Sequence, residues 1–145
     1  IVRVMPNTPA TIRKGVSCLI ANRHTCEDQI ELVEKLFSVV SKIIRLDTEK
    51  QMDAVTALSG SGPAYVFFLI EVLTSVGIEL GLDAKLAKTL SVSTVSGAGM
   101  LAEKTDTEVE HLRHNVTSPN GTTEAALNIL MDPSVINQKK KQNIN

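Results

Sequence analysis

The amino-acid sequence predicts a mainly α-helical protein that begins with a small α/β segment. From residue 47 onward, apolar side chains recur at helical spacing between glycine, proline and capping residues. Before residue 47, short β-branched runs flank one amphipathic stretch, which is the pattern of strands around a helix. Aromatic residues make up only 3% of the chain and tryptophan is absent, so the core must consist of aliphatic side chains. That composition suits packed helices.

The composition otherwise is that of a globular domain, with 145 residues, of which 43% are hydrophobic and 21% charged. The formal net charge of −1 predicts no affinity for nucleic acid or for membranes. The most apolar run, residues 64–70, is much shorter than a membrane span, and Glu71 interrupts its continuation. Cys18 and Cys26 are spaced neither as a redox pair nor as a zinc knuckle. We therefore expect free thiols in a reducing, cytoplasmic setting.

The α/β segment, residues 1–46, is expected to contain three strands and one helix. The strands are expected at residues 1–5, 15–22 and 42–46. The helix is expected at residues 25–41, with Thr25 as its cap and Asp28 adding negative charge to its first turn. This is a piece of an α/β sheet that is too small to stand alone.

Five helices are expected in the remainder of the chain. They are predicted at residues 49–59, 63–80, 83–104, 107–114 and 124–131. The Gly60–Pro63 segment should stop the first of them, and Ser61 should cap the second. Gly81 should end that second helix, and Asp83 should cap the third.

The third helix is crowded with small residues. They are Ser91, Ser93, Thr94, Ser96, Gly97, Ala98 and Gly99. Small side chains let two helix backbones approach, so this stretch predicts a tight helix–helix contact. Thr107 and Glu110 match a capping box for the short fourth helix. The tail, residues 132–145, is polar and basic and is predicted to be disordered.

Two short patterns could carry chemistry but favour plain structural roles. Gly60 and Gly62 resemble the start of a dinucleotide fingerprint, but Tyr65 stands where its third glycine should be, and the stretch follows a helix. A kink between helices is the better interpretation. Glu108, Glu110, His111 and His114 lie close together on one short expected helix and could form a metal site, but no fourth ligand is evident at the spacings of Glu110, His111 and His114. We interpret them as a solvated helix face and predict no metal site.

The segment HNVTSPNGTTEAA, residues 114–126, is harder to dismiss. Thr122, Thr123 and Glu124 stand at a helix start, where backbone N–H groups lack intrahelical partners and favour an anion such as a carboxylate. The hydroxyls of Ser118, Thr122 and Thr123 add donors, and Asn120-Gly121 permits a left-handed turn. From these residues alone two interpretations stay open, a small-anion site and simple capping with turn chemistry.

Two longer motifs carry a family resemblance. DAVTALSGSGPAYVF (53–67) and VTSPNGTTEAAL (116–127) resemble the signature segments of pyrroline-5-carboxylate reductases, and RVMPNTPA (3–10) resembles the segment that ends that family's dinucleotide-binding domain. The resemblance runs from about Arg3 to Leu130.

The resemblance implies a domain plan. Residues 1–46 would be the C-terminal remnant of a Rossmann domain. Residues 47–131 would be an all-helical dimerisation and substrate-binding domain, like the C-terminal domain of 6-phosphogluconate dehydrogenase, and residues 132–145 a tail. The family's nucleotide fingerprint is absent from this sequence, and after Leu130 the sequence departs from the family's Ala- and Arg-rich final helix. We expect a homodimer, with a larger ring possible, and an isolated chain without activity.

The resemblance also implies a reaction and a set of site residues. The reaction is reduction of 1-pyrroline-5-carboxylate to L-proline by NADPH or NADH. The sequence does not decide which of the two coenzymes is preferred. Thr123 and Glu49 are the implied catalytic residues. The implied substrate-binding residues are Val116, Ser118, Thr122, Thr123, Thr56, Ser61 and Glu49, with Glu49 reaching a neighbouring subunit's site. The implied cofactor-binding residues are Asn7, Thr8 and Asn115.

Two alternatives remain. The chain could be an inactive helical dimerisation module, which the absent fingerprint favours. It could also belong to a related imine or 6-phosphogluconate-type dehydrogenase, against which the loop before the last helix argues.

Overall fold

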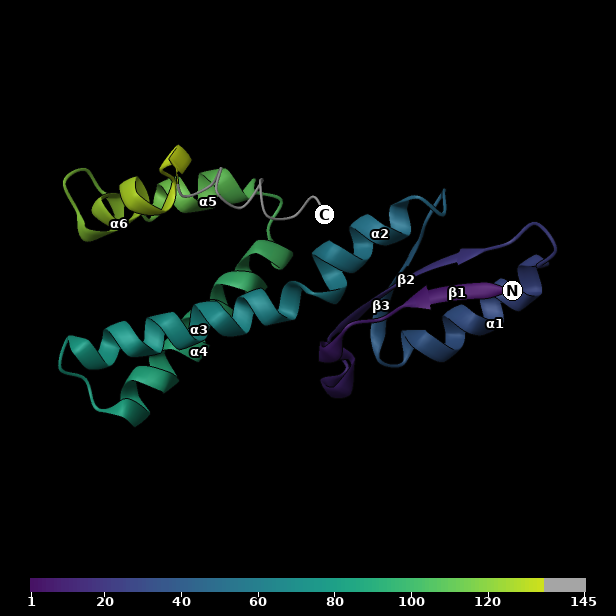
Figure 1. The fold of residues 1–145 in the computed structure, drawn as a ribbon, viewed down its shortest axis with the longest axis horizontal. Helices are drawn as coiled ribbons and strands as arrows, with labels where there is room; N and C mark the ends of the chain where they lie inside the picture. Colours follow the sequence, from purple (N-terminus) through teal and green to yellow (C-terminus); the bar gives the residue numbers. More distant parts are fainter. Residues whose placement is uncertain (135–145) are drawn as a thin grey trace. The chain divides into compact units, whose positions relative to one another are not determined.

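The computed structural model describes residues 1–134 of the chain and contains a three-stranded sheet and a series of helices (Figure 1). The first elements are β1 (Val2–Met5), the 3₁₀-helix η1 (Thr8–Ile12), β2 (Gly15–Ala21), α1 (Glu27–Ser38) and β3 (Ser41–Arg45). They are followed by α2 (Gln51–Val55), the π-helical turn η2 (Thr56–Gly60), α3 (Gly62–Glu79), α4 (Ala84–Lys104), α5 (Val109–Asn115) and α6 (Thr122–Leu130). The fold class is therefore the expected one, mainly helical after a small α/β segment.

The described chain divides into two compact units, Ile1–Val95 and the residues from Ser96 onward. The division falls inside α4. The sequence-based boundary at residues 46 and 47 follows the change from strands to helices instead, and it stays a prediction.

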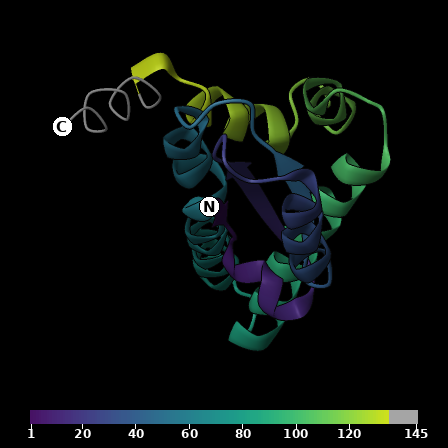
Figure 2. The same ribbon diagram turned by 90° about the vertical axis from the view of Figure 1, so that its right-hand side faces the viewer.

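The sheet in the first unit has the order β1-β2-β3. β1 pairs with β2 in antiparallel fashion, with Met5 opposite Cys18, and β2 pairs with β3 in parallel, with Leu19 opposite Arg45. The parallel pair needs a crossover, which α1 provides. Helix α1 lies along the sheet (Figures 1 and 2).

The core of this unit sits on both faces of β2. Leu19 is almost fully buried on the face that α1 covers. Cys18 is buried on the opposite face, and its cross-strand neighbour Met5 lies near η2. Met52 of α2 has no exposed surface at all. The sheet and the α2–η2 segment therefore share an apolar core, which holds η2 against the end of β1.

Two expected caps are wrong. Helix α1 is capped by Cys26, with Gln29 reaching back to the Cys26 N–H at 3.2 Å, and not by Thr25. The Thr25 hydroxyl instead lies within donating distance of the Asn22 Oδ1, at 2.8 Å, and of the Ile1 carbonyl, at 3.1 Å. These contacts take it away from the helix start. The capping box at Thr107 is also wrong, because α5 begins at Val109 without a side-chain cap.

The expected helix stop at Gly60–Pro63 is wrong in an informative way. The backbone does not leave the helical region; it widens into η2, where the Ser61 N–H donates to the Thr56 carbonyl five residues back at 2.9 Å. Ser61 occupies the position before α3, but its side chain makes no capping bond. A π-turn of this kind adds a residue without ending the helix.

The turn between α3 and α4 is as predicted. Gly81 takes a left-handed conformation with φ of 97°, and the Leu82 N–H donates to the Gly77 carbonyl, which is a Schellman ending. The Asp83 carboxylate accepts the N–H groups of Lys85 and Leu86 at 3.0 and 3.1 Å, so it caps α4.

The tight contact between α3 and α4 lies near this turn. A Cβ added to Gly77 would stand 3.1 Å from the Ala87 Cβ, which shows how closely the backbones approach. A Cβ at Gly97 or Gly99 would meet no heavy atom within 4 Å. The run is therefore uncovered at Gly97 and Gly99, while Ser91 at its start is buried and the contact with α3 lies near the start of α4.

Candidate functional site

The loop before α6 is a tight turn closed by one backbone bond. The Gly121 N–H donates to the Ser118 carbonyl at 3.1 Å, with Pro119 and Asn120 between them. Asn120 has a φ of 59°, so proline followed by a left-handed residue gives a type II turn. Gly121 itself has a φ of −86°. It is required for space, because an added Cβ would lie 2.5 Å from the Ser118 Oγ.

The start of α6 presents free donors. Within residues 1–134, the N–H groups of Thr122, Thr123 and Glu124 have no acceptor. No side chain caps this helix, because its cap position is Gly121. The described structure also shows no hydrogen bond for the hydroxyls of Ser118, Thr122 or Thr123. Simple capping therefore does not account for the hydroxyls, and the arrangement favours an anion at the helix start.

Two neighbouring side chains hold this loop in shape. The Thr117 hydroxyl donates to the Arg113 carbonyl at 2.7 Å, which ties the loop to α5. The Glu124 carboxylate accepts the Asn120 N–H at 2.8 Å, which fixes the tip of the turn. Neither contact was predicted from the sequence, although Glu124 three positions after the cap is a recognisable signal.

Asn115 and Val116 lie directly before the loop. Asn115 is the last residue of α5 and Val116 follows it; both side chains are exposed. With Ser118, Thr122 and Thr123, they place five of the predicted site residues within one loop and its two flanking helix ends.

A second group of predicted residues lies around η2. Thr56 is its first residue, and the Thr56 hydroxyl donates to the Met52 carbonyl at 2.8 Å. Ser61 follows η2 directly. The Asn7 side chain reaches the same turn, with its Nδ2 3.3 Å from the Ser59 carbonyl. Thr8 begins η1 and its side chain is exposed. Sequence reasoning missed Ser59, which is 52 residues from Asn7.

Glu49 lies apart from that group, just before α2. Its carboxylate forms an ion pair with Arg3 of β1, and both side chains are more than half exposed. The pair borders a hollow of about 420 Å³ together with Ile1, Ile20 and Asn22. Arg3 was not predicted as a partner, because no local signal links residues 46 positions apart.

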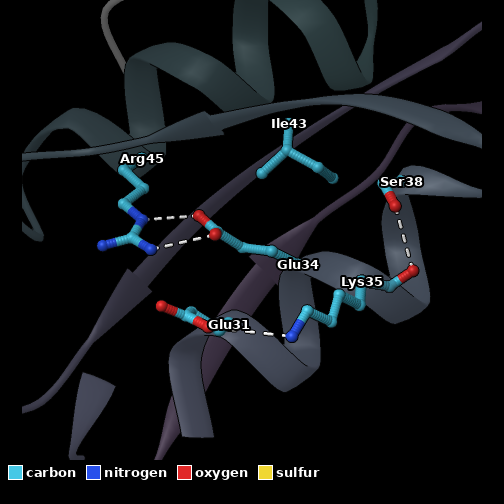
Figure 3. A pocket seen from close by; sticks show the side chains of 6 residues that line it. All are labelled: Glu31, Glu34, Lys35, Ser38, Ile43 and Arg45. Atoms are coloured by element: carbon cyan, nitrogen blue, oxygen red, sulfur yellow. Dashed lines mark hydrogen bonds and ion pairs between the residues drawn. The ribbon is translucent and has the colours of Figure 1, made fainter. Parts of the chain in front are cut away.

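A hollow of about 540 Å³ lies between α1 and β3 (Figure 3). There the Arg45 guanidinium makes two bonds to the Glu34 carboxylate, at 2.5 and 2.9 Å, and one to Glu27 at 2.6 Å. The hydrogen bonds from Arg45 hold the pKa of Glu34 below its usual value. The hydrogen bonds that Arg45 donates to Glu34 and Glu27 raise the pKa of Arg45 further above its already high value. None of the predicted site residues lines this hollow.

The apolar side chains of α3 and α4 are largely uncovered. Tyr65, Phe67 and Phe68 are 63%, 57% and 65% exposed. The helical stretch Gln51–Glu79, taken as one segment of 29 residues, is long and apolar enough to cross a membrane by length and composition. The expected helices at 49–59 and 63–80 correspond to α2 with η2 and to α3, and they count as one apolar segment because η2 keeps a helical backbone between them. Because core helices of water-soluble proteins pass the same test, this is weak evidence for a membrane span.

Within residues 1–134 no group of three or more histidine, cysteine, aspartate or glutamate side chains could hold a metal ion. The Glu110 carboxylate lies 3.7 Å from the His114 ring and 3.6 Å from Arg113, as a solvated helix face would place it.

An α/β segment, long helices with uncovered apolar surface and a helix start that favours an anion define a helical dimerisation domain of the kind found in nicotinamide-dependent oxidoreductases. Comparison with known proteins is specific. A family model described as pyrroline-5-carboxylate reductase dimerisation matches residues 49–140. The chain therefore belongs to the pyrroline-5-carboxylate reductase family.

Individual relatives agree with this assignment. The chain is 49% identical to the pyrroline-5-carboxylate reductase of Pseudomonas aeruginosa over 127 residues, which are 88% of this chain and 46% of the relative. It is 44% identical to the Arabidopsis thaliana reductase over 129 residues, 89% of this chain and 46% of the relative. The chain thus spans about half the length of the curated relatives it matches.

Solved structures give the same result. A reductase from Coxiella burnetii superposes with a TM-score of 0.88 at 41% identity, covering 97% of this chain and 52% of that one. The Plasmodium falciparum reductase, solved with NADP bound, superposes with a TM-score of 0.87 at 36% identity. The match covers 95% of this chain and 55% of that one.

Proposed function

We propose that this chain is the substrate-binding and dimerisation part of a pyrroline-5-carboxylate reductase. The whole enzyme would reduce the C=N bond of 1-pyrroline-5-carboxylate to give L-proline. The observation that carries the proposal is the start of α6, where three free N–H groups stand in a segment resembling the family's signature. The substrate is small and has one carboxylate, which is the guest that such a helix start favours.

The loop would hold this carboxylate and so orient the ring. The N–H groups of Thr122 and Thr123 and the Thr122 hydroxyl would bind it, while Ser118 and Val116 shape the pocket. Fixing the ring in one orientation accounts for much of what an enzyme must do when the chemical step is a direct hydride transfer. Thr56 and Ser61, at the ends of η2, would line the substrate pocket, and Glu49 would reach the substrate of a neighbouring subunit.

Proton delivery requires little from this chain. A cyclic imine is basic enough to arrive protonated, so the ring nitrogen needs stabilisation more than a strong acid. We assign Thr123 as a donor toward the nitrogen of the neutral imine, or Glu49 as a carboxylate that stabilises the positive charge of the protonated iminium. The Arg3–Glu49 ion pair implies that Glu49 leaves Arg3 when it takes this role.

The coenzyme, NADPH or NADH, would supply the hydride. These 145 residues contain no glycine-rich turn between a strand and a helix for a pyrophosphate, so they do not by themselves fit a dinucleotide. Only the nicotinamide side would meet this chain, at Thr8 and Asn115. The resemblance also implies Asn7, but its side-chain amide is engaged by the Val16 N–H and by Ser59. The free edge of β1 in the described sheet is compatible with further strands alongside it.

The uncovered helices fit a homodimer. Exposed aromatic and aliphatic side chains along α3 and α4 form more apolar surface than a monomer usually presents. A second copy of the chain covering these helices would bury that surface, in agreement with the dimerisation family model. We also propose a cytoplasmic location, with Cys18 and Cys26 as the free thiols observed.

An inactive dimerisation module is the second candidate, because the chain spans only about half of its relatives. Thr123→Ala distinguishes the two when the chain is joined to the nucleotide-binding half of the Pseudomonas aeruginosa relative. We expect kcat/KM for the imino acid to fall about 100-fold, because a positioned donor is lost. Thr107→Ala, an exposed hydroxyl at the start of α5, is the control. Unchanged kinetics in Thr123→Ala would remove Thr123 from the site.

A further inference from the structure

The Asn7 side chain is held at both ends within the first unit. Its Oδ1 accepts the Val16 N–H at 2.9 Å, and its Nδ2 lies 3.3 Å from the Ser59 carbonyl and 3.4 Å from the Ser59 hydroxyl. The Val16 backbone can only donate, so it fixes which end of the amide is oxygen. The nitrogen end must then face η2.

The Ser59 carbonyl needs an outside donor for a covalent reason. In a continuous α-helix it would accept the N–H of residue 63, but that residue is Pro63 and has no hydrogen on its nitrogen. The next N–H group, of Ala64, donates to the Ser61 carbonyl instead. Asn7 therefore supplies the hydrogen bond that Pro63 takes away from the helix.

The packing around this contact indicates that the Asn7 hydrogen bond helps to hold η2 against the end of β1. Met52, one turn earlier, is fully buried, and a Cβ on Gly60 would lie 3.7 Å from the Met5 sulfur. Met5 and Asn7 belong to one short segment at the end of β1. Apolar contact and the Asn7 amide thus fasten both sides of the same turn to that segment.

We propose that Asn7 is a positioning residue that holds η2, and through it Thr56 and Ser61, in the geometry needed for substrate. This assignment rests on the proposed function. It differs from a direct contact with the nicotinamide, because an Asn7 side chain turned toward the coenzyme would leave both the Val16 N–H and the Ser59 carbonyl without their partner.

Asn7→Asp tests the proposal without dismantling the loop. The carboxylate can still accept the Val16 N–H, but it has no N–H for the Ser59 carbonyl. In the 145-residue chain without ligands, we expect hydrogen exchange of the Ser61 amide, which closes η2, to become about tenfold faster. Thr11→Ala, which removes an exposed hydroxyl from η1, should leave it unchanged. Unchanged Ser61 exchange in Asn7→Asp would overturn the proposal.

A rescue variant tests the role of the carbonyl. Adding Pro63→Ala to Asn7→Asp gives residue 63 an N–H that can donate to the Ser59 carbonyl. We expect slower exchange at Ser61 in the double variant than in Asn7→Asp alone. No recovery would contradict the assignment of Asn7 as the replacement for that missing N–H.

Kinetics then separate positioning from coenzyme contact. In the chain joined to a nucleotide-binding half, Asn7→Asp should lower kcat/KM for the imino acid roughly 10- to 100-fold, with the coenzyme Kd within about twofold of the parent. A tenfold rise in coenzyme Kd with unchanged imino-acid kinetics would overturn the proposal, as would faster exchange with unchanged kinetics. A parent enzyme without turnover would refute the proposed function, and the exchange measurements would still decide how η2 is held.

Discussion

Gly121 shows how a single missing side chain shapes the candidate site. Its φ of −86° is accessible to any residue, so glycine is not needed for backbone conformation there. It is needed because the Ser118 Oγ and carbonyl stand 2.5 and 3.1 Å from where a Cβ would be. The close approach keeps Ser118 beside the free N–H groups at the start of α6.

Gly121→Ala should therefore damage substrate binding. The Ser118 hydroxyl can rotate away, but its carbonyl can move only with the turn, so the loop must open by a few tenths of an ångström. We expect KM for the imino acid to rise about tenfold and the chain to lose about 1 kcal/mol of stability. Gly99→Ala is the control, because its added Cβ would meet nothing within 4 Å. Equal KM values for the two variants would contradict this account of Gly121.

The Glu34–Arg45 pair predicts a pH dependence of stability. Arg45 holds the pKa of Glu34 below its unfolded value of about 4.3. Between the folded and the unfolded pKa of Glu34, the unfolded chain therefore binds more protons than the folded chain. The ion pair's contribution to stability is present above the unfolded pKa and is lost as pH falls through the folded pKa.

Urea midpoints measured between about pH 5 and pH 3 test this expectation. The parent midpoint should fall more steeply with acid than that of Glu34→Gln. Glu31→Gln is the control, because the Glu31 carboxylate is on the same helix and pairs with Lys35 at 3.7 Å. The pH dependence of its urea midpoint should match that of the parent. A Glu34→Gln profile parallel to the parent would show that the ion pair does not stabilise the fold.

For single residues, the sequence predicted capping and helix-ending positions better than it predicted contacts between distant side chains. Asp83 and Gly81 act as expected because capping and helix ending depend on neighbours in sequence. The partners Arg3–Glu49 and Asn7–Ser59 were not predictable, since only folding brings residues 46 and 52 positions apart together. Thr25 was mispredicted because its hydroxyl is engaged by Asn22 and by the Ile1 carbonyl instead of the helix start.

Among the elements, η2 is the one whose geometry matters most for the site. It lies between α2 and α3, carries Thr56 and is followed by Ser61. Glycines and a proline suggested a break, but proline at the first helical positions is compatible with a helix that continues. The residue types marked the place correctly, while the widened turn depends on tertiary contacts with Met5 and Asn7.

Deleting Leu58 should convert η2 into an ordinary α-turn. Removing one residue narrows the turn, so Thr56 and Ser61 would be separated by one residue fewer and would no longer hold their present positions. We expect the helical circular dichroism signal to persist, while turnover in the joined enzyme falls at least about 100-fold. Leu58→Ala keeps the residue count at a position that is 81% exposed and should retain activity within a few-fold. Full activity after the deletion would mean that the π-turn has no role in the site.

The elements themselves were mostly predictable, since each of the expected strands and helices outside the tail has a counterpart. The last helix begins at Thr122, two residues earlier than expected, which includes both threonines in its first turn. The predicted disordered tail lies almost entirely outside the described residues. Only its first part is described, where the Asp132 carboxylate accepts the Ser134 N–H at 2.7 Å.

For the whole molecule, the important property is that the described chain leaves apolar surface and a sheet edge uncovered. Its helices leave aromatic side chains uncovered, its sheet has a free edge at β1 in the described part, and it spans about half of its relatives. These features agree with a role that needs other polypeptide to bury surface and to bind coenzyme. Composition alone could not reveal this, because 43% hydrophobic content is ordinary and burial depends on what the helices face.

The most direct test is NADPH oxidation with 1-pyrroline-5-carboxylate, using this chain at a concentration where sedimentation shows a dimer. We predict no turnover from the folded dimer alone, and turnover once the chain is joined to the nucleotide-binding half of the Pseudomonas aeruginosa relative. Turnover by the chain alone would contradict the assignment of coenzyme binding to the absent half. A folded, joined protein without activity would contradict the central claim that this chain contributes the substrate site of a reductase.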